Sequence, residues 1–227
     1  MKIISMTNMG QIDMMKNMLN SAERVGIPLN LFTVYLMNDI PQASDFWTMN
    51  FYNITYRKLK LIYDTLVQLP EGERLFWVDN DIYFFTNPLS ELESFEEDFV
   101  MQDDIHTGCT GFWTIKRSEK TCNLLKNSLE FMKNNKHERM HDQIAVWETM
   151  KRTNHGCSLR LLDRFSYPVG DVYFKPEDYG YTNRSQAKIL HNNFLFNAVS
   201  KVDRFKQNNL WNPSDEASSK LTIIRLK

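Results

Sequence analysis

The chain has 227 residues, of which 42% are hydrophobic, 13% aromatic and 24% charged. This composition supplies enough apolar material for a buried core, in one large domain or two small ones. The 27 basic and 28 acidic side chains leave a formal net charge of −1, which gives no long-range field for nucleic acid or an anionic membrane. No run of about 18 apolar residues exists, so no membrane span is expected. The start of the chain has no apolar core of a signal peptide, and three cysteines cannot all pair; we therefore expect reduced thiols in a cytoplasmic protein.

Short apolar runs alternate with helical patterns along the chain. The expected elements, in order, are a strand at 2–6, a helix over 14–25, a strand at 31–37, a helix over 59–69, a strand at 75–78, a strand at 111–115, a helix capped by Ser118 and a helix over 144–150. This alternation predicts an α/β fold with a mostly parallel central sheet flanked by helices. Residues 1–212 form the single expected domain, and 213–227, which begin Pro-Ser-Asp-Glu, are expected to be a tail or a connector to further domains.

An acidic triplet, Asp79-Asn80-Asp81, follows directly on the densest apolar run, residues 75–78. Ligands of open α/β sheets collect beyond the carboxyl ends of the strands. Side chains at i and i+2 of an extended backbone point to the same side, so the two carboxylates could share one divalent cation. The alternative is a turn between two strands that merely exposes its acids.

Other enzyme classes also use paired acids or histidines. A haloacid-dehalogenase-type phosphatase expects Thr or Val where this chain has Tyr83, and expects its motif near the start. A nucleotidyltransferase usually carries a Gly-rich basic loop after the first strand, which residues 9–11 (Met-Gly-Gln) do not provide. A zinc site is a further alternative, although its spacing is loose and no cysteine pair accompanies it. Its candidate ligands are His137, His141, His155 and Cys157.

Several stretches resemble the nucleotide-diphospho-sugar transferases, a family of GT-A-fold glycosyltransferases. The most specific stretch is 74–89, which combines a strand, the Asp-x-Asp motif, an aromatic run and a closing Asn-Pro-Leu. The other matching segments are Thr7-Asn8, Arg57 with Lys60, residues 111–118, His141-Asp142-Gln143, and His191-Asn192-Asn193 with Lys201 and Leu210-Trp211. Compact members of this family occur in bacteria and in large DNA viruses of algae. We expect a soluble protein of that kind, located in the host cytoplasm if it is viral.

The resemblance implies a metal-dependent enzyme that transfers a hexose or deoxyhexose from a UDP-sugar to a carbohydrate or glycoprotein-glycan acceptor, with retention. Mn²⁺, or Mg²⁺ in its place, would be held by Asp79, Asp81 and His191, because oxygen and imidazole ligands suit these ions. Asp142 and Gln143 are the expected catalytic residues, with Gln143 facing the anomeric carbon in a front-face mechanism. As the first residue of a helix, Asp142 is equally suited to be its N-cap. The residues expected to bind the nucleotide-sugar are Thr7, Asn8, Arg57, Lys60, Asp79, Asn80, Asp81, Thr110, Gly111, Asn193 and Lys201.

Two features leave alternatives open. Family members usually carry Asn-Ser-Gly or Asn-Ala-Gly where this chain has residues 109–111, Cys-Thr-Gly, so an amide is missing and the sugar is not identified. The aromatic segment 46–52 is either a mobile lid over the nucleotide or part of the core. The second candidate function is a catalytically silent sugar-nucleotide-binding domain of a larger glycan-assembly protein.

Overall fold

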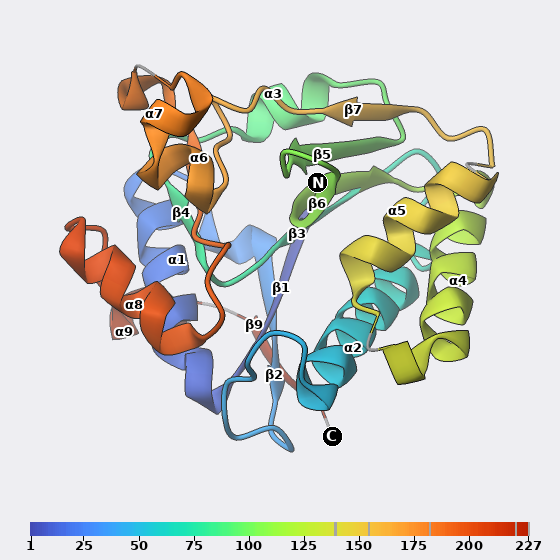
Figure 1. Ribbon diagram of the computed structural model, residues 1–227, viewed down its shortest axis with the longest axis horizontal. Coiled ribbons are helices and arrows are strands. Elements are labelled where there is room, and N and C mark those ends of the chain that lie inside the picture. Colours follow the sequence, from blue (N-terminus) through green and yellow to red (C-terminus); the bar gives the residue numbers. More distant parts are fainter. Residues whose placement is uncertain (139, 154, 182, 221, 227) are drawn as a thin grey trace.

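A central seven-stranded sheet organises the molecule (Figure 1). The computed structural model describes residues 1–138, 140–153, 155–181, 183–220 and 222–226. The strand order is β7-β5-β6-β3-β1-β2-β9, formed by β1 (Lys2–Asn8), β2 (Phe32–Met37), β3 (Arg74–Val78), β5 (Phe99–Asp103), β6 (Gly108–Lys116), β7 (Leu159–Leu161) and β9 (Thr222–Leu226). A separate antiparallel pair joins β4 (Ile82–Phe84) to β8 (Ile189–His191).

The sheet is mostly parallel, as the sequence predicts. β1 runs parallel to β2 and β3, β2 to β9, and β5 to β7. The exception is β6, which lies antiparallel between β3 and β5. The helices are α1 (Ile12–Arg24), α2 (Met49–Leu66), α3 (Leu89–Ser94), α4 (Glu119–Asn134), α5 (Asp142–Thr153), α6 (Gly170–Phe174), α7 (Pro176–Tyr179), α8 (Ala198–Gln207) and α9 (Asp215–Ser219).

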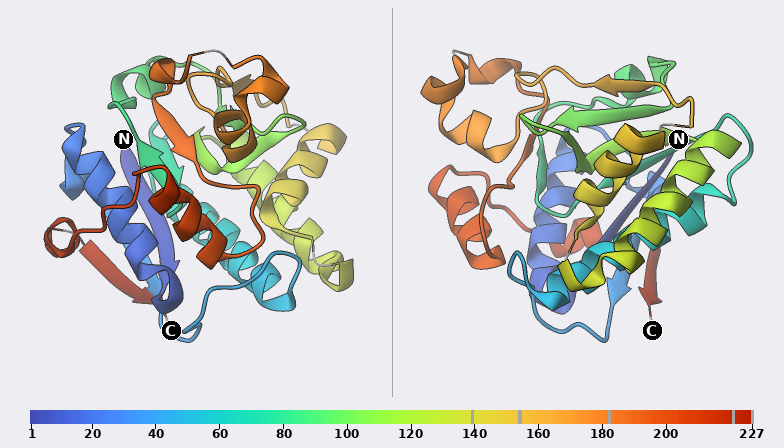
Figure 2. Two further views of the ribbon diagram at one scale, coloured as in Figure 1. Left: turned by 60° about the vertical axis from the view of Figure 1, so that its left-hand side comes forward. Right: turned by 45° about the vertical axis from the view of Figure 1, so that its right-hand side comes forward.

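Helices cover both faces of the sheet, which explains why its central strands are continuous apolar runs rather than alternating ones. Ile3 of β1 belongs to a core that includes Met18 and Leu19 of α1, whereas Ile4 belongs to the opposite core. The opposite core is built with α2, α4 and α5, which pack together on one side of the sheet (Figure 2). Successive residues of β1 therefore enter different cores.

Helix starts are set by local caps. Ser118 caps α4 as predicted: its hydroxyl accepts a hydrogen bond from Thr121 N–H at 3.2 Å. Helix α2 begins at Met49, ten residues before the predicted start at 59, because the Thr48 hydroxyl accepts from Phe51 N–H at 3.1 Å and caps the helix there. The aromatic and polar residues that follow Thr48 conceal this first half of α2 in the sequence.

The C-terminal segment has regular structure. Helix α9 packs against α1, and β9 adds a parallel strand to the β2 edge of the sheet. The division into a domain at 1–212 and a tail at 213–227 stays a prediction, and β9 is the part of that segment that joins the sheet. Among the described residues, no helix is both long and apolar enough to cross a membrane.

Candidate active site

The acidic triplet forms the connection between β3 and β4. Strand β3 ends at Val78, and Ile82 N–H donates to the Asp79 carbonyl oxygen at 3.3 Å, so the segment is a turn. The expectation of an extended backbone through the triplet was therefore wrong. The chain reverses here between the two acids, while Asp79 N–H donates to the Gly111 carbonyl oxygen of β6 at 2.7 Å.

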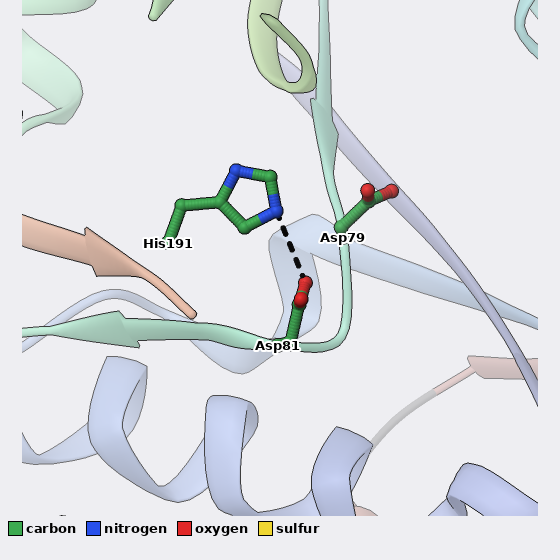
Figure 3. Close-up of side chains that lie close together, drawn as sticks. All are labelled: Asp79, Asp81 and His191. Carbon is green, nitrogen blue, oxygen red and sulfur yellow. Dashed lines mark ion pairs between the residues drawn. The ribbon is translucent and has the colours of Figure 1, made fainter. Parts of the chain in front are cut away.

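Three side chains converge at this turn with the donor atoms of a metal site. One ligand atom from each of Asp79, Asp81 and His191 lies within 4.8 Å of the others. His191 reaches the turn because β8 pairs with β4 and sets it opposite Ile82. Its Nε2 lies 3.3 Å from Asp81 Oδ1, and Figure 3 shows the imidazole facing Asp81 while the Asp79 carboxylate is turned away from both. Among the described residues no other three His, Cys, Asp or Glu side chains gather in this manner, and the side chain of His137 lies outside the description.

A buried glutamine orients His191. Gln102, in β5, donates from Nε2 to the Tyr167 carbonyl oxygen at 2.9 Å, which fixes its amide. Its Oε1 therefore faces His191 and accepts the Nδ1–H at 3.0 Å. With the proton held on Nδ1, Nε2 presents its lone pair to the turn, as metal-binding histidines require. The sulfur of Cys109 lies 3.4 Å from the same Nδ1.

Lys201, from α8, lies on the other side of Asp81. Its Nζ is 2.6 Å from Asp81 Oδ2, and the Asp81 carboxylate is almost completely buried. Burial by itself would raise the pKa of Asp81, but the adjacent Lys201 ammonium outweighs that effect and holds the pKa well below its ordinary value. Asp81 is therefore a carboxylate at neutral pH.

Lys58 connects the metal-site acids to the start of α5. Its Nζ lies 3.0 Å from Asp79 Oδ1 and 3.0 Å from Asp142 Oδ2, and its side chain is 8% exposed. Burial would lower the pKa of Lys58, but Asp142 and Asp79 raise it above the ordinary value. Burial would likewise raise the pKa of Asp142, and Lys58 lowers it instead. Thr110 donates to the same Asp142 oxygen at 2.8 Å.

The amide of Gln143 is held in one orientation. Its Nε2 donates to Asp104 Oδ2 at 2.6 Å and to Thr107 Oγ1 at 2.9 Å. Since both acceptors engage the nitrogen, the amide oxygen remains free to interact with a ligand in the cavity that Gln143 lines. Asp104 also accepts from Asn193 Nδ2 at 3.0 Å, so one carboxylate positions side chains from α5 and from the segment after β8.

These groups surround a cavity of about 470 Å³. Ten of the residues expected from the sequence line it: Asp79, Asn80, Asp81, Thr110, Gly111, Asp142, Gln143, His191, Asn193 and Lys201. The lining thus brings together segments that lie more than a hundred residues apart in the chain.

Four expected residues lie elsewhere. Thr7 and Asn8 are buried at the end of β1, where Thr7 Oγ1 accepts from Asn80 at 3.3 Å. Arg57 is partly exposed and Lys60 is about half exposed, and they form ion pairs with Asp39 and Asp64. The structure does not bring either of these basic residues to the cavity, and α2 presents Lys58 there instead.

The aromatic segment 46–52 has side chains both at the cavity and in the core, and its role as a mobile lid stays a prediction. Phe46 and Phe51 line the cavity. Tyr52 points into the core, where it is 3% exposed and its hydroxyl donates to the Met132 carbonyl at 3.1 Å.

A protein-family comparison covers most of the chain. The model of the nucleotide-diphospho-sugar transferase family matches residues 14–205. This range includes every element that supplies a metal-site or Asp142-site residue.

Curated relatives extend the comparison. A UDP-galactose:fucoside α-3-galactosyltransferase of Dictyostelium discoideum is 25% identical over 95% of this chain and 43% of its own length. UDP-D-xylose:L-fucose α-1,3-D-xylosyltransferase 3 of Arabidopsis thaliana is 23% identical over 79% of this chain and 52% of its own length. The chain spans about half the length of these relatives.

Solved structures share the architecture. Galactosyltransferase LgtC, in complex with donor and acceptor sugar analogs, aligns with a TM-score of 0.57 at 12% identity, covering 97% of this chain and all of its own. A glycosyltransferase involved in the glycosylation of the major capsid of PBCV-1 aligns with a TM-score of 0.60 at 14% identity, covering 92% of this chain and all of its own. These likenesses confirm the expected GT-A fold.

Proposed function

Because the chain belongs to the nucleotide-diphospho-sugar transferase family, we propose that it is a metal-dependent glycosyltransferase that moves a sugar from a UDP donor to a carbohydrate acceptor. The observation that carries this proposal is the gathering of Asp79, Asp81 and His191 beside Lys58 and Lys201 on one cavity wall. The curated relatives are named for UDP-galactose and UDP-xylose as donors and for fucosides as acceptors. These are the substrates to test first. UDP-galactose carries a hexose, as expected from the sequence, whereas UDP-xylose carries a pentose and tests a donor outside that class.

The side chains at the turn fit a hard divalent cation such as Mn²⁺ or Mg²⁺. Two carboxylates and an imidazole whose Nδ1 proton is already committed to Gln102 are a donor set of the required chemistry. Asp79, Asp81 and His191 would hold the ion. When bound, it would neutralise negative charge on the diphosphate leaving group.

The charges around the cavity support a metal requirement. The carboxylates of Asp79, Asp81 and Asp142 face the ammonium groups of Lys58 and Lys201, which leaves a net charge of −1 with His191 neutral. A divalent cation changes this to +1. A diphosphate would be repelled by the first arrangement and attracted by the second, so we expect nucleotide binding to need the ion.

The groups beside the metal site support a retaining, front-face reaction. Asp142 is the one carboxylate outside the metal site in the described lining, and its Oδ2 is engaged by Lys58 and Thr110. Gln143 presents a neutral amide oxygen, which is a weak nucleophile but can stabilise positive charge at an anomeric carbon. Asp142 would then bind sugar hydroxyls, and the leaving group would depart before the acceptor attacks from the same face.

Donor hydrolysis tests this proposal. We expect the chain to hydrolyse UDP-galactose or UDP-xylose slowly in Mn²⁺ and to stop in EDTA. Asp81→Asn should abolish the reaction, whereas Asp64→Asn, which removes a surface carboxylate paired with Lys60, should leave it unchanged. A rate of donor hydrolysis that is unchanged both in EDTA and in the Asp81→Asn variant would refute metal dependence. Tight UDP binding with no turnover on any donor or fucoside would favour the silent binding domain instead.

A further inference from the structure

Four aromatic side chains gather at the mouth of the cavity, and we call them the aromatic rim: Phe46, Trp47, Phe51 and Phe196. The Phe46 ring centroid lies 4.8 Å from that of Trp47, 5.1 Å from that of Phe51 and 6.5 Å from that of Phe196. Phe46, Phe51 and Phe196 line the cavity, and Phe196 is 73% exposed. Large apolar side chains held in contact with solvent beside a cavity usually mark a binding surface.

The rim is built from two distant segments that are tied together. Phe46 N–H donates to the Phe196 carbonyl oxygen at 3.0 Å and joins the loop after β2 to the segment that leads into α8. Figures 1 and 2 show these two segments side by side near the start of α2. Each carries a bulky residue in the left-handed backbone region, Trp47 with φ 66° and Phe194 with φ 59°. Such strain is uncommon for aromatic residues and tends to occur at ligand clamps.

The rim lies past Asp142 along the cavity wall. Contacts run from Asp79 through Lys58 to Asp142, and His141 Nδ1 then lies 3.8 Å from Asp142 Oδ1. The His141 ring is in turn surrounded by the rim, with its centroid 5.6 Å from that of Phe46.

The loop that carries Phe46 is anchored to the end of β1. The Gln42 carbonyl accepts from Asn8 Nδ2 at 3.2 Å, at the end of β1. If the diphosphate binds at Asp79 and the donor sugar at Asp142, the aromatic rim lies beyond the donor sugar and remains free for a further ligand.

We propose that the aromatic rim is the acceptor subsite and that it stacks against the apolar C–H face of a neutral pyranose. This inference rests on the proposed function, which places the donor sugar beside Asp142. A pyranose ring has one face rich in C–H groups and hydroxyls at its edge, so it can cover an aromatic side chain while its hydroxyls remain free. None of the four rim side chains is charged, which favours a neutral sugar over a sugar acid or a second nucleotide.

Saturation-transfer NMR with a panel of neutral methyl pyranosides tests the subsite, using the chain loaded with UDP and Mg²⁺, which is diamagnetic and does not broaden the ligand signals. We expect at least one pyranoside to receive saturation mainly on the C–H protons of one ring face. Phe196→Ala should weaken its Kd by about tenfold, as the loss of one aromatic contact predicts. Phe196→Trp should preserve binding. The matched control is Val199→Ala, because Val199 is 70% exposed but does not line the cavity.

The Kd of UDP separates the outcomes. The UDP Kd should be the same in the wild-type chain and in the Phe196→Ala, Phe196→Trp and Val199→Ala variants, since the rim lies beyond the donor. A pyranoside Kd unchanged by Phe196→Ala, or a wild-type chain that binds UDP with Mg²⁺ but no pyranoside, would overturn the subsite and leave the proposed function standing. Weaker UDP binding in Phe196→Ala would show that the rim holds the nucleotide instead. Failure of the wild-type chain to bind UDP would overturn both proposals.

Discussion

Gly111 shows how closely the candidate metal site is packed. A Cβ at this position would lie 2.2 Å from His191 Cε1 and 2.9 Å from Asp79 Oδ2. Both neighbours are expected ligands, so any side chain here must displace them. A glycine is required here because the His191 and Asp79 side chains approach the β6 backbone closely. Backbone conformation does not require it, since the φ of Gly111 is not in the left-handed region.

Gly111→Ala is therefore expected to lower Mn²⁺ affinity at least tenfold, about the effect of disturbing a group that positions a metal ligand. Electron paramagnetic resonance of Mn²⁺ measures this directly. Gly26→Ala is the matched control, because its Cβ meets nothing within 4 Å but its φ is +79°. The control should cost about 1 kcal/mol of folding free energy and leave Mn²⁺ affinity intact. Equal Mn²⁺ affinity in both variants would contradict the packing argument.

Asp104 is expected to act through Gln143. Asp104→Ala removes one of the two acceptors that hold the Gln143 amide nitrogen, so the amide oxygen would lose its fixed position. A misplaced group of this kind can cost about 100-fold in rate. We expect kcat for donor hydrolysis to fall by roughly that factor while the Kd of UDP stays the same. A matching loss in UDP affinity would mean that Asp104 supports the cavity as a whole.

At this scale the sequence indicates the acids and Lys201 that line the cavity, but it selects the wrong basic residues of α2. The Asp-x-Asp triplet stands out because it interrupts apolar residues. Lys58 could have been found from helical phase, since Thr55 and Ile62, three residues before and four after it, are also buried. Arg57 and Lys60 lie off that face and pair with surface acids. Gln102 gives no comparable signal, because its role depends on β5 passing behind His191.

At the scale of elements, Asp98 links β5, β7 and α4 at the edge of the sheet. Next to β5, its carboxylate accepts from Ser158 N–H and Oγ at 2.8 and 2.9 Å, just before β7, and from Lys120 of α4 at 2.6 Å. Burial would raise the pKa of Asp98, but Lys120 and Ser158 outweigh it and lower the pKa.

A lowered pKa in the folded state means that the carboxylate stabilises the fold above the unfolded-state pKa of about 3.9. That contribution is lost as the pH falls through the folded-state value. We expect Asp98→Asn to lower the free energy of unfolding by about 1–2 kcal/mol at pH 7, and the difference from wild type to shrink below about pH 4. Urea denaturation across pH measures this. Glu96→Gln, whose carboxylate is 93% exposed, should show no difference, and a pH-independent deficit in Asp98→Asn would contradict the assignment.

Helices α1, α4 and α5 are predictable from their periodicity, whereas the first half of α2 and the shortest strands are not. Strands β4 and β8 have three residues each and pair across about a hundred residues of sequence. No local pattern specifies that pairing, yet it delivers His191 to Asp81. The turn at the triplet depends on the same pairing, so the sequence indicates the candidate metal ligands but not the way in which they meet.

At the scale of the whole molecule, the site depends on the sheet. The β3–β4 turn, β6, α2, α5 and the segment between β8 and α8 all supply residues to one cavity beyond the carboxyl end of β3. The alternation of elements predicts this fold class and the location of the acids. It does not predict the antiparallel β6 or the edge strand β9, because strand order depends on long-range pairing.

Calorimetric titration of UDP into the chain, with Mn²⁺ and with EDTA, tests the central claim most directly. A cavity that changes from −1 to +1 when it binds the ion should gain affinity for UDP by about 100-fold or more in Mn²⁺. Asp81→Asn should remove most of that gain, whereas Asp64→Asn should not. The same UDP affinity in Mn²⁺ and in EDTA would contradict the account.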